Sequence, residues 1–558
     1  MTNEALATDD LVLRFGTSSA QVAGQILDYL SPRRKPDLRM NADLDLPDLP
    51  DLERMVVGLL DLQTKTEPTG LSQFVTQPRG RAEARMGIRL AGSPSAISYD
   101  GEVTFRQAAF HVLGWNLEVS DLSGVVQVRK ETLMTDGLSL KVGRGSVQMK
   151  GSLHDYLTAQ HDGDVHLTFT DIQDFDLVTF LPSRLVPPQG GALSGQADVT
   201  LRKDGQVKTA GKVTLNRVLL DPLPAVFSPM EIIRGEVSWQ GQSGTFVVQQ
   251  GRSPAGAFIG SGRFLSFSPF TMEMTMDFAD FDVDAVLKLD QPKEQERAPK
   301  DNTVTVRVDL NAGCLVYKTF SAEQVHASCY WHDRQADLRI AEGKTMGGSI
   351  HGEVVLWPDL DALYLAPQIS GADVKRFSAA FDTATSMLIG TLNGEGKIYL
   401  PDWHDWDNPA RWDAQLSLAV LDGVAQRAPI LVRLWSAVSL QGLLSLRLPS
   451  LPNEGLAFSS LTGDFALGGG LTVTENLSFS GSSVQIDASG DIDLTRQAVD
   501  LKTALMLLYG ITSSVAKIPL AGRSLARGAD MLTTLSFRIH GPYQNPTVPP
   551  LLMNRDRR

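Results

Sequence analysis

Ser514 and Lys517 are the residues whose spacing comes closest to a known catalytic motif. In penicillin-recognising enzymes, the Ser-x-x-Lys spacing sets a nucleophilic hydroxyl beside a lysine base. The sequence contains neither the Ser-Asp-Asn nor the Lys-Thr-Gly element that completes such a site. A motif with only two fixed positions arises by chance in a chain of 558 residues. We therefore expect no catalytic site and predict that the protein is not an enzyme.

The other residues that bind metals or phosphates do not cluster along the chain. The nine histidines are scattered singly, without His-Glu-x-x-His spacing. His404 lies between Trp403 and Trp406, which favours a loop anchored by two aromatic side chains. No phosphate-binding loop of the Gly-x-x-x-x-Gly-Lys-Ser/Thr type occurs, and the glycines at 468–470 predict a hairpin turn. We predict no metal site and no cofactor.

Only two cysteines occur, Cys314 and Cys329, on two strand-like segments that could face each other across a hairpin. Two interpretations remain open at this point. One is a disulfide in an oxidising envelope compartment, and the other is a pair of buried free thiols.

Composition limits the class of protein. The formal charge is 51 − 64 = −13, without a long basic run, which excludes a nucleic-acid binder. Hydrophobic residues make up 42% and charged residues 21%, as expected for a chain that folds around a core. With 49 glycines and 29 prolines, turns must be frequent, and this favours short strands over helices. The first 30 residues show no export signal.

Alternation of apolar and polar residues is the dominant pattern of the chain. It predicts strands with one buried and one wetted face, which is typical of an antiparallel sheet. The clearest runs are Leu38, Met40, Ala42, Leu44 and Leu46; Val165, Leu167 and Phe169; Met272, Met274, Met276 and Phe278; Val304, Val306, Val308 and Leu310; and Leu535, Phe537 and Ile539.

A loose repeat of about 90 to 140 residues runs through the sequence. Each copy has a strand between glycines, then a second alternating strand, then an acidic and apolar stretch that we expect to form a short helix. The first strands of the five copies are 16–24, 145–151, 256–262, 347–352 and 481–490. Residues 8–24 resemble the end of a copy, so we expect upstream sequence to be missing.

Few helices are expected. Short ones are predicted at 51–64 and 374–386, and polar linkers at 290–302 and 401–411. The stronger candidate runs from Pro429 to Leu446 and carries an apolar face. We also expect helix over roughly 503–532, as an end cap packed on the sheet or as a helix pair on a membrane surface. The membrane-surface candidates are Leu431, Leu434, Trp435 and Val438.

The apolar face of such a sheet must be covered. Because helices are too few to cover it, the sheet either closes on itself or curls into a trough that accepts an apolar guest. Repetition favours the trough: about 25 strands spaced 4.8 Å apart would extend on the order of 120 Å. The predicted fold is mainly β, an elongated repetitive antiparallel sheet curled into a hydrophobic groove, with a few short helices and C-terminal amphipathic helices. The groove candidates are Met40, Leu44, Val165, Leu167, Phe169, Met272, Met274, Met276, Phe278, Val304, Val306, Val308, Val484, Ile486 and Phe537.

The C-terminal third contains a recognisable series of motifs. They are Leu443-Leu-Ser-Leu446, the stretch Gly455 to Gly470, Leu477 to Ile486, Gly490 to Leu494, and the closing Phe537-Arg-Ile-His-Gly541 with Asn545-Pro546. In these residues the chain resembles the AsmA-like family of bacterial envelope proteins. The earlier repeats look like the longer, YhdP-type members. We therefore predict two regions, a repetitive β-groove segment at 1–411 and an AsmA-like C-terminal region at 412–558.

The resemblance implies a protein of the diderm periplasm that moves phospholipid along a hydrophobic β-groove between inner and outer membranes. It also implies association with the inner membrane through an N-terminal anchor, which we expect to be missing here. Expected partners are phospholipid, membrane surfaces at the ends and envelope proteins. The alternative is a structural or assembly factor for outer-membrane proteins with a closed β core. A β-rich adhesin ranks last, because aromatic residues are only 7%.

Overall fold

The computed structural model describes twenty segments of the chain. They are residues 4–28, 35–48, 75–91, 96–112, 117–129, 132–155, 162–173, 191–220, 230–267, 269–287, 304–332, 335–357, 360–380, 388–402, 405, 408–426, 455–482, 484–507, 534–542 and 545–549. The chain divides into two compact units, Met1–Glu273 with Leu289–Asn302, and Met274–Lys288 with Thr303–Arg558.

The first unit is built from β-strands. They are β1 (Ala5–Phe15), β2 (Ser18–Leu27), β3 (Lys35–Asp45), β4 (Val75–Ala91), β5 (Ala96–Val112), β6 (Leu117–Arg129), β7 (Thr132–Val142), β8 (Gly145–His154), β9 (Asp162–Ile172), β10 (Ala192–Leu201), β11 (Val207–Leu220), β12 (Met230–Gln240), β13 (Ser243–Ser253) and β14 (Gly256–Phe267). Strand β15 (Phe270–Asp282) contains the boundary between the units.

Strands also make up the second unit. They are β16 (Val304–Tyr317), β17 (Phe320–His332), β18 (Gln335–Thr345), β19 (Gly348–Trp357), β20 (Ala362–Asp373), β21 (Leu388–Leu400), β22 (Asp413–Ala425), β23 (Leu456–Gly468), β24 (Leu471–Gly481), β25 (Val484–Asp493), β26 (Ala498–Leu507) and β27 (Thr534–Pro542).

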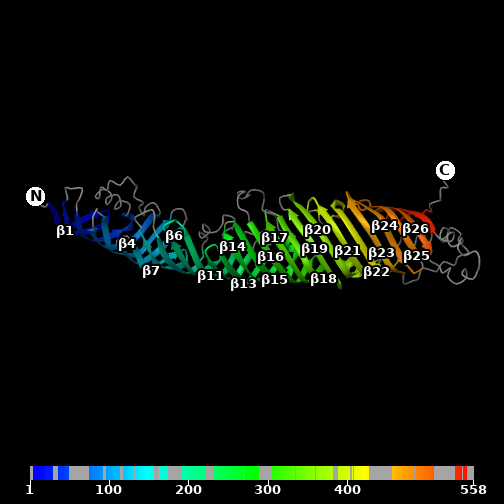
Figure 1. The fold of residues 1–558 in the computed structure, drawn as a ribbon, viewed down its shortest axis with the longest axis horizontal. Helices are drawn as coiled ribbons and strands as arrows, with labels where there is room; N and C mark the ends of the chain where they lie inside the picture. The colour runs from blue at the N-terminus through cyan, green and yellow to red at the C-terminus, as the bar shows by residue number, and fades with distance from the viewer. Residues whose placement is uncertain are drawn as a thin grey trace, which may run out of the picture. The chain divides into compact units, whose positions relative to one another are not determined.

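All 27 strands belong to one sheet. Within each unit the pairings are antiparallel and join strands that follow one another in the chain, as in β2 with β3 and β25 with β26 (Figure 1). Among the described residues no pairing joins β27 to β1, so the sheet is open. The predicted antiparallel fold is confirmed.

The repeat read from the sequence corresponds to hairpins. The first strands of its five copies are β2, β8, β14, β19 and β25, and the alternating runs lie on β3, β9, β15, β16 and β27. The glycines at 469 and 470 have positive φ and turn the chain between β23 and β24, as predicted.

Short helices follow three of these hairpins: η1 (Leu46–Asp48), α2 (Val283–Leu287) and α3 (Val374–Ala380). Each α-helix starts after an aspartate whose carboxylate accepts a hydrogen bond from a backbone N–H of the first turn, Asp282 from Ala285 at 3.0 Å and Asp373 from Arg376 at 2.9 Å. These caps explain the acidic residues of the repeat. A further single turn, η6 (Pro409–Arg411), lies in the predicted linker at 401–411.

The helix predicted over 503–532 is wrong where it can be tested. Residues 503–507 lie in strand β26, in which Leu501, Thr503 and Leu505 are buried and Lys502 is exposed. That period of two is a strand pattern, which the helix assignment overlooked. The remainder of that segment lies outside the described residues, as do the helices predicted at 51–64 and 429–446, the whole linker at 290–302, and residues 381–386 beyond α3.

Asp48, in the single turn η1, ties that turn to the hairpin of β1 and β2. Its carboxylate accepts hydrogen bonds from the Ser18 hydroxyl at 2.7 Å and from the backbone N–H groups of Thr17 and Ser18 at 3.0 and 3.1 Å. These bonds, that of the Ser18 hydroxyl first, hold the pKa of Asp48 below its usual range. The side chain lies where a Cβ on Gly16 would stand, which explains glycine at that turn.

β-Bulges interrupt the alternation in several strands. In β5, Phe105 pairs with Gly124 and Ala108 with Leu122, so one strand advances three residues while its partner advances two. Gln107, inside this bulge, has φ 52°. Phe105 and Ala108 both pack in one apolar cluster despite their odd spacing. A bulge therefore keeps apolar side chains on one face while it bends the strand.

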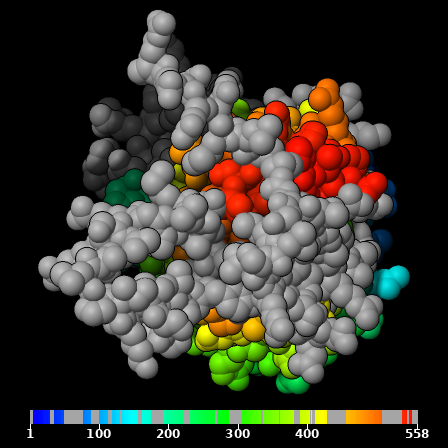
Figure 2. Space-filling model, turned by 90° about the vertical axis from the view of Figure 1, so that its right-hand side faces the viewer, coloured from blue at the N-terminus to red at the C-terminus, as the bar shows by residue number. Residues whose placement is uncertain are grey.

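The outer edge of β27 is occupied by residues 545–549. The backbone N–H of Arg538 donates to the carbonyl of Pro549, and His540 and Thr547 exchange hydrogen bonds at 2.9 and 2.8 Å. Pro546 and Pro549 have no N–H to offer a further strand. Figure 2 shows the surface of β27 and this segment in red. The edge is thus closed against further pairing.

Candidate functional site

The candidate site is the face of the sheet onto which the apolar side chains alternate, here called the apolar face. In the first unit its rows can be followed strand to strand through the register. Met149, Leu167 and Ala197 face one another across β8, β9 and β10. The next row towards the end of β9 joins Val147, Phe169 and Gly195.

The predicted residues of the first unit are half-buried. Val165, Leu167 and Phe169 lie on β9, and Met40 and Leu44 lie on β3 against a cluster formed by Ala20, Ala42 and Ala84. Their side chains keep part of their surface open to solvent. Half-buried apolar rows of this kind leave surface that a further apolar group can cover.

In the second unit the predicted residues are more deeply buried. Met276 and Val484 are 0% exposed and Phe537 is 1% exposed. Others that are buried are Met274, Phe278, Val306, Val308 and Ile486. Met272, which belongs to the first unit, is half-buried. The side chain of Val304 lies outside the described set, as do Leu431, Leu434, Trp435 and Val438.

One cluster brings three of the predicted residues together. Val484, Ile486 and Phe537 belong to an apolar cluster that runs from β20 to β27. Within it the rings of Phe458 and Phe479 lie with centroids 5.1 Å apart. The other predicted residues lie outside this cluster, and Met40 and Leu44 share the cluster on β3.

The opposite face carries charged side chains in cross-strand pairs. Arg106 lies 3.0 Å from Glu83, and Lys212 lies 2.7 Å from Glu236. In β26 and β27, Arg538 holds both carboxylate oxygens of Asp500, at 2.7 and 2.6 Å. This fork keeps the pKa of Asp500 below its usual range. Each strand therefore separates a wetted face from an apolar one.

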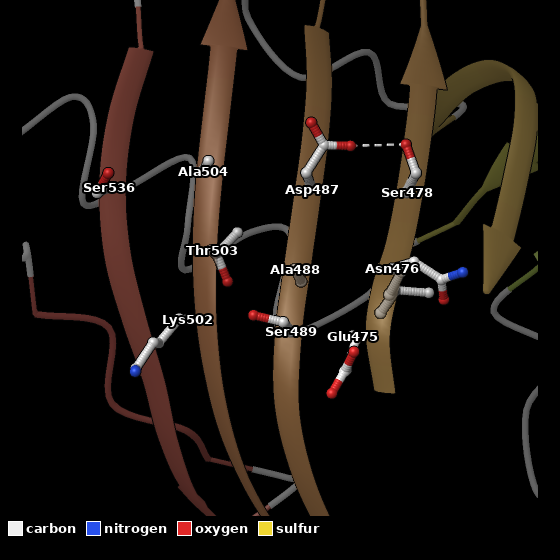
Figure 3. A pocket seen from close by; sticks show the side chains of 11 residues that line it. Glu475, Asn476, Ser478, Asp487, Ala488, Ser489, Lys502, Thr503, Ala504 and Ser536 are labelled. Atoms are coloured by element: carbon white, nitrogen blue, oxygen red, sulfur yellow. Dashed lines mark hydrogen bonds between the residues drawn. The ribbon is translucent and has the colours of Figure 1, made fainter. Parts of the chain in front are cut away.

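The polar face also carries a hollow of about 510 Å³ over β24 to β27 (Figure 3). Ser478, Asp487, Ala504 and Ser536 form one row of its lining, and Asp487 accepts a hydrogen bond from the Ser478 hydroxyl at 2.7 Å. Most of its lining residues, Ser536 among them, have side chains on the polar face. Leu477, Ala488 and Thr503 also border it, although their row ends at Phe537 on the apolar face. None of the predicted groove residues borders it.

A family model described as YhdP protein matches residues 262–548, just over half of the chain. The chain belongs to the YhdP family. YhdP proteins are AsmA-like proteins of the bacterial envelope, and the family is generally non-enzymatic. The resemblance noted from the C-terminal sequence is thereby confirmed. Neither a curated protein nor a solved structure matches the chain with significance.

Sequence reasoning missed much of the apolar face of this YhdP-family chain. Leu392, Val420, Phe458 and Phe479 are buried in the cluster of the second unit but were not predicted. The signal was present in the alternation of β22, in which Leu416, Leu418 and Val420 share a face. It was broken after Val420 by a bulge at Asp422, which has φ 49°.

The two cysteines are free and do not face each other, which corrects the expectation of a facing pair. Cys314 pairs with exposed Glu323, whereas Cys329 pairs with buried Val308. The two register positions are six residues apart, about 20 Å along the strands, far beyond the span of a disulfide. The half-buried thiols remain separate.

Cys329 should react slowly with thiol reagents. Burial, with a smaller contribution from the Asp337 carboxylate, raises the pKa of Cys329 to about 11, so its thiolate is scarce at neutral pH. We expect maleimide to label a Cys329→Ser variant, through Cys314, at least tenfold faster than a Cys314→Ser variant. Mass spectrometry of timed samples measures both rates. Equal rates, or a native chain that is two hydrogens lighter and regains them on reduction, would contradict the assignment.

Among the described residues, no group of three or more His, Cys, Asp or Glu side chains is placed to hold a metal ion. The part of the chain that the structure describes contains no helix long and apolar enough to cross a membrane. Ser514, Lys517 and His404 lie outside it.

Proposed function

We propose that this YhdP-family protein is a non-enzymatic lipid carrier of the cell envelope. Acyl chains of phospholipid would lie along the apolar face, curled into a groove, while head groups stay in water. The observation that carries the proposal is the alternation of the two faces, seen where Leu167 and Phe169 are on the apolar face and Thr168 and Thr170 on the polar face.

The energetics favour such a path. Removing one methylene from water contributes about 0.8 kcal/mol, and the half-buried rows of β3 and β9 have apolar surface left to cover. Transfer along rows of similar side chains then requires no bond to be made or broken. In this proposal the carrier works in the periplasm between inner and outer membranes, meets a membrane surface at each end and docks on envelope proteins there.

A second function is favoured by a different observation. In the second unit the apolar residues Met276, Val484 and Leu505 are 0% exposed. A dry, closed core of that kind suits a structural or assembly factor for outer-membrane proteins. The two functions differ in whether lipid reaches the apolar face.

Site-specific crosslinking separates them. A benzophenone amino acid at Phe169, which is half-buried on the apolar face, should label phospholipid in cells. The same group at Thr170, exposed on the opposite face of the same strand, should label little. Lipid mass spectrometry of the purified chain should recover several phospholipids per chain. Absence of lipid from both the crosslink at Phe169 and the purified chain would favour the assembly factor.

A further inference from the structure

Two threonines interrupt the apolar face near the end of the second unit. Thr474 on β24 is in one row with Gly490 and Leu501, and Thr503 on β26 is in the next row with Ala488 and Phe537. Thr474 is 1% exposed and Thr503 is 3% exposed. Figure 3 shows Thr503 beside Ala488 on the neighbouring strand.

Both hydroxyls lack a hydrogen-bond partner among the described residues. Among the described residues, only the buried hydroxyl of Tyr317, on β16, also makes no hydrogen bond, whereas two further buried hydroxyls of the sheet have partners. That of Ser253 donates to the carbonyl of Gly256 at 3.3 Å, and that of Thr345 donates to the carbonyl of Ser321 at 2.7 Å. A buried hydroxyl without a partner is unfavourable, so the two threonines keep donors that a ligand can satisfy. Because both side chains are almost fully covered, the groups that cover them must move aside before a ligand binds.

The residues between the two threonines are small. On β25, which separates β24 from β26, the positions in these two rows are Gly490 and Ala488. No bulky side chain of β25 therefore stands between the two hydroxyls. Together the four residues form a small polar spot within the apolar face.

The chemistry of the spot selects a neutral acceptor. Lys502 and Arg538 are the only lysine and arginine of β24 to β27, and both alternate onto the opposite face, where Asp500 holds Arg538. A phosphate or carboxylate would therefore find no cation beside the two hydroxyls among the described side chains. An ester carbonyl accepts hydrogen bonds, carries no charge and is attached to an acyl chain.

We propose that Thr474 and Thr503 bind the ester carbonyls of a diacyl glycerolipid. The proposal rests on the proposed function and adds one defined binding position for the lipid. There the glycerol region of the lipid is recognised while its acyl chains follow the apolar rows. Apolar side chains predominate on the rest of the face, and they do not distinguish one hydrocarbon chain from another.

The test compares a diacyl phosphatidylcholine with its dialkyl ether analogue, which has the same chains but no carbonyl groups. A benzophenone amino acid at Leu477, half-buried in the row of Thr503, reports occupancy in the full chain. In the chain that retains both threonines, we expect the diacyl lipid to reach half-maximal labelling at a concentration about tenfold lower than the ether analogue. In the double variant Thr474→Val, Thr503→Val this preference should vanish.

Thr472→Val is the matched control. Thr472 is also buried on β24, but its hydroxyl is not among the unpartnered ones, so the variant should keep the preference. Valine has the shape of threonine and favours strands. Equal labelling by the two lipids before any substitution, or a preference that survives the double variant, would overturn this subsite while leaving lipid binding intact. Labelling by neither lipid would overturn the carrier function itself.

Discussion

Replacing Phe537 with alanine should destabilise the end of the second unit by about 3–5 kcal/mol. The side chain is 1% exposed and lies in the cluster that also contains Leu505, Val484 and Phe479. Truncation leaves a cavity that strands held by backbone hydrogen bonds cannot collapse to fill. The expected result is a loss of amide protection in β25, β26 and β27.

Hydrogen exchange followed by mass spectrometry measures the amide protection of each strand separately. A local measurement is needed because a chain with two units need not unfold in one step. Tyr399→Ala is the control: Tyr399 is an aromatic residue of β21 in the same unit, but it is 42% exposed. Protection of β25 to β27 should not change in that variant. If the two variants behave alike, Phe537 does not pack in a core.

Introducing a carboxylate at Leu167 should stop lipid movement without unfolding the protein. Leu167 is half-buried on the apolar face, so an aspartate there can remain hydrated while the groove is empty. An acyl chain that passes this position must displace the water that hydrates the aspartate, at a cost of about 3 kcal/mol. Transfer of lipid between donor and acceptor vesicles should slow by about a hundredfold.

Thr168→Asp provides the matched control, since Thr168 is the next residue of the same strand and is exposed on the polar face. It should transfer lipid at the native rate. Circular dichroism checks that both variants keep their β content. If Leu167→Asp transfers lipid normally while folded, acyl chains do not pass over β9.

The sequence predicted the hairpins well because a period of two is local information. Val165, Leu167 and Phe169 identify β9 without knowledge of any other strand. The same reasoning failed at 503–507, where Leu505 and Leu507 sit in an apolar run that suits helix or strand equally. The pairing of β26 with β25 and β27 decides between them, and that is tertiary information.

The β-bulges could not be predicted from the sequence for a related reason. Gln107 and Asp422 adopt positive φ although nothing in their immediate sequence requires it. Their backbone is imposed by two strands that pair out of step. The cysteines show the same limit: their 15-residue separation suggested a facing pair, while the register sets Cys314 and Cys329 six positions apart.

Pairing between successive strands has a consequence for how the protein folds. Because each hairpin finds its partner in the next segment of chain, loop closure is short and contact order is low for an all-β protein. Each unit can therefore assemble hairpin by hairpin in the order of synthesis, and each finished hairpin offers its edge as a template for the next. In the second unit this propagation stops at β27, where residues 545–549 occupy the last edge.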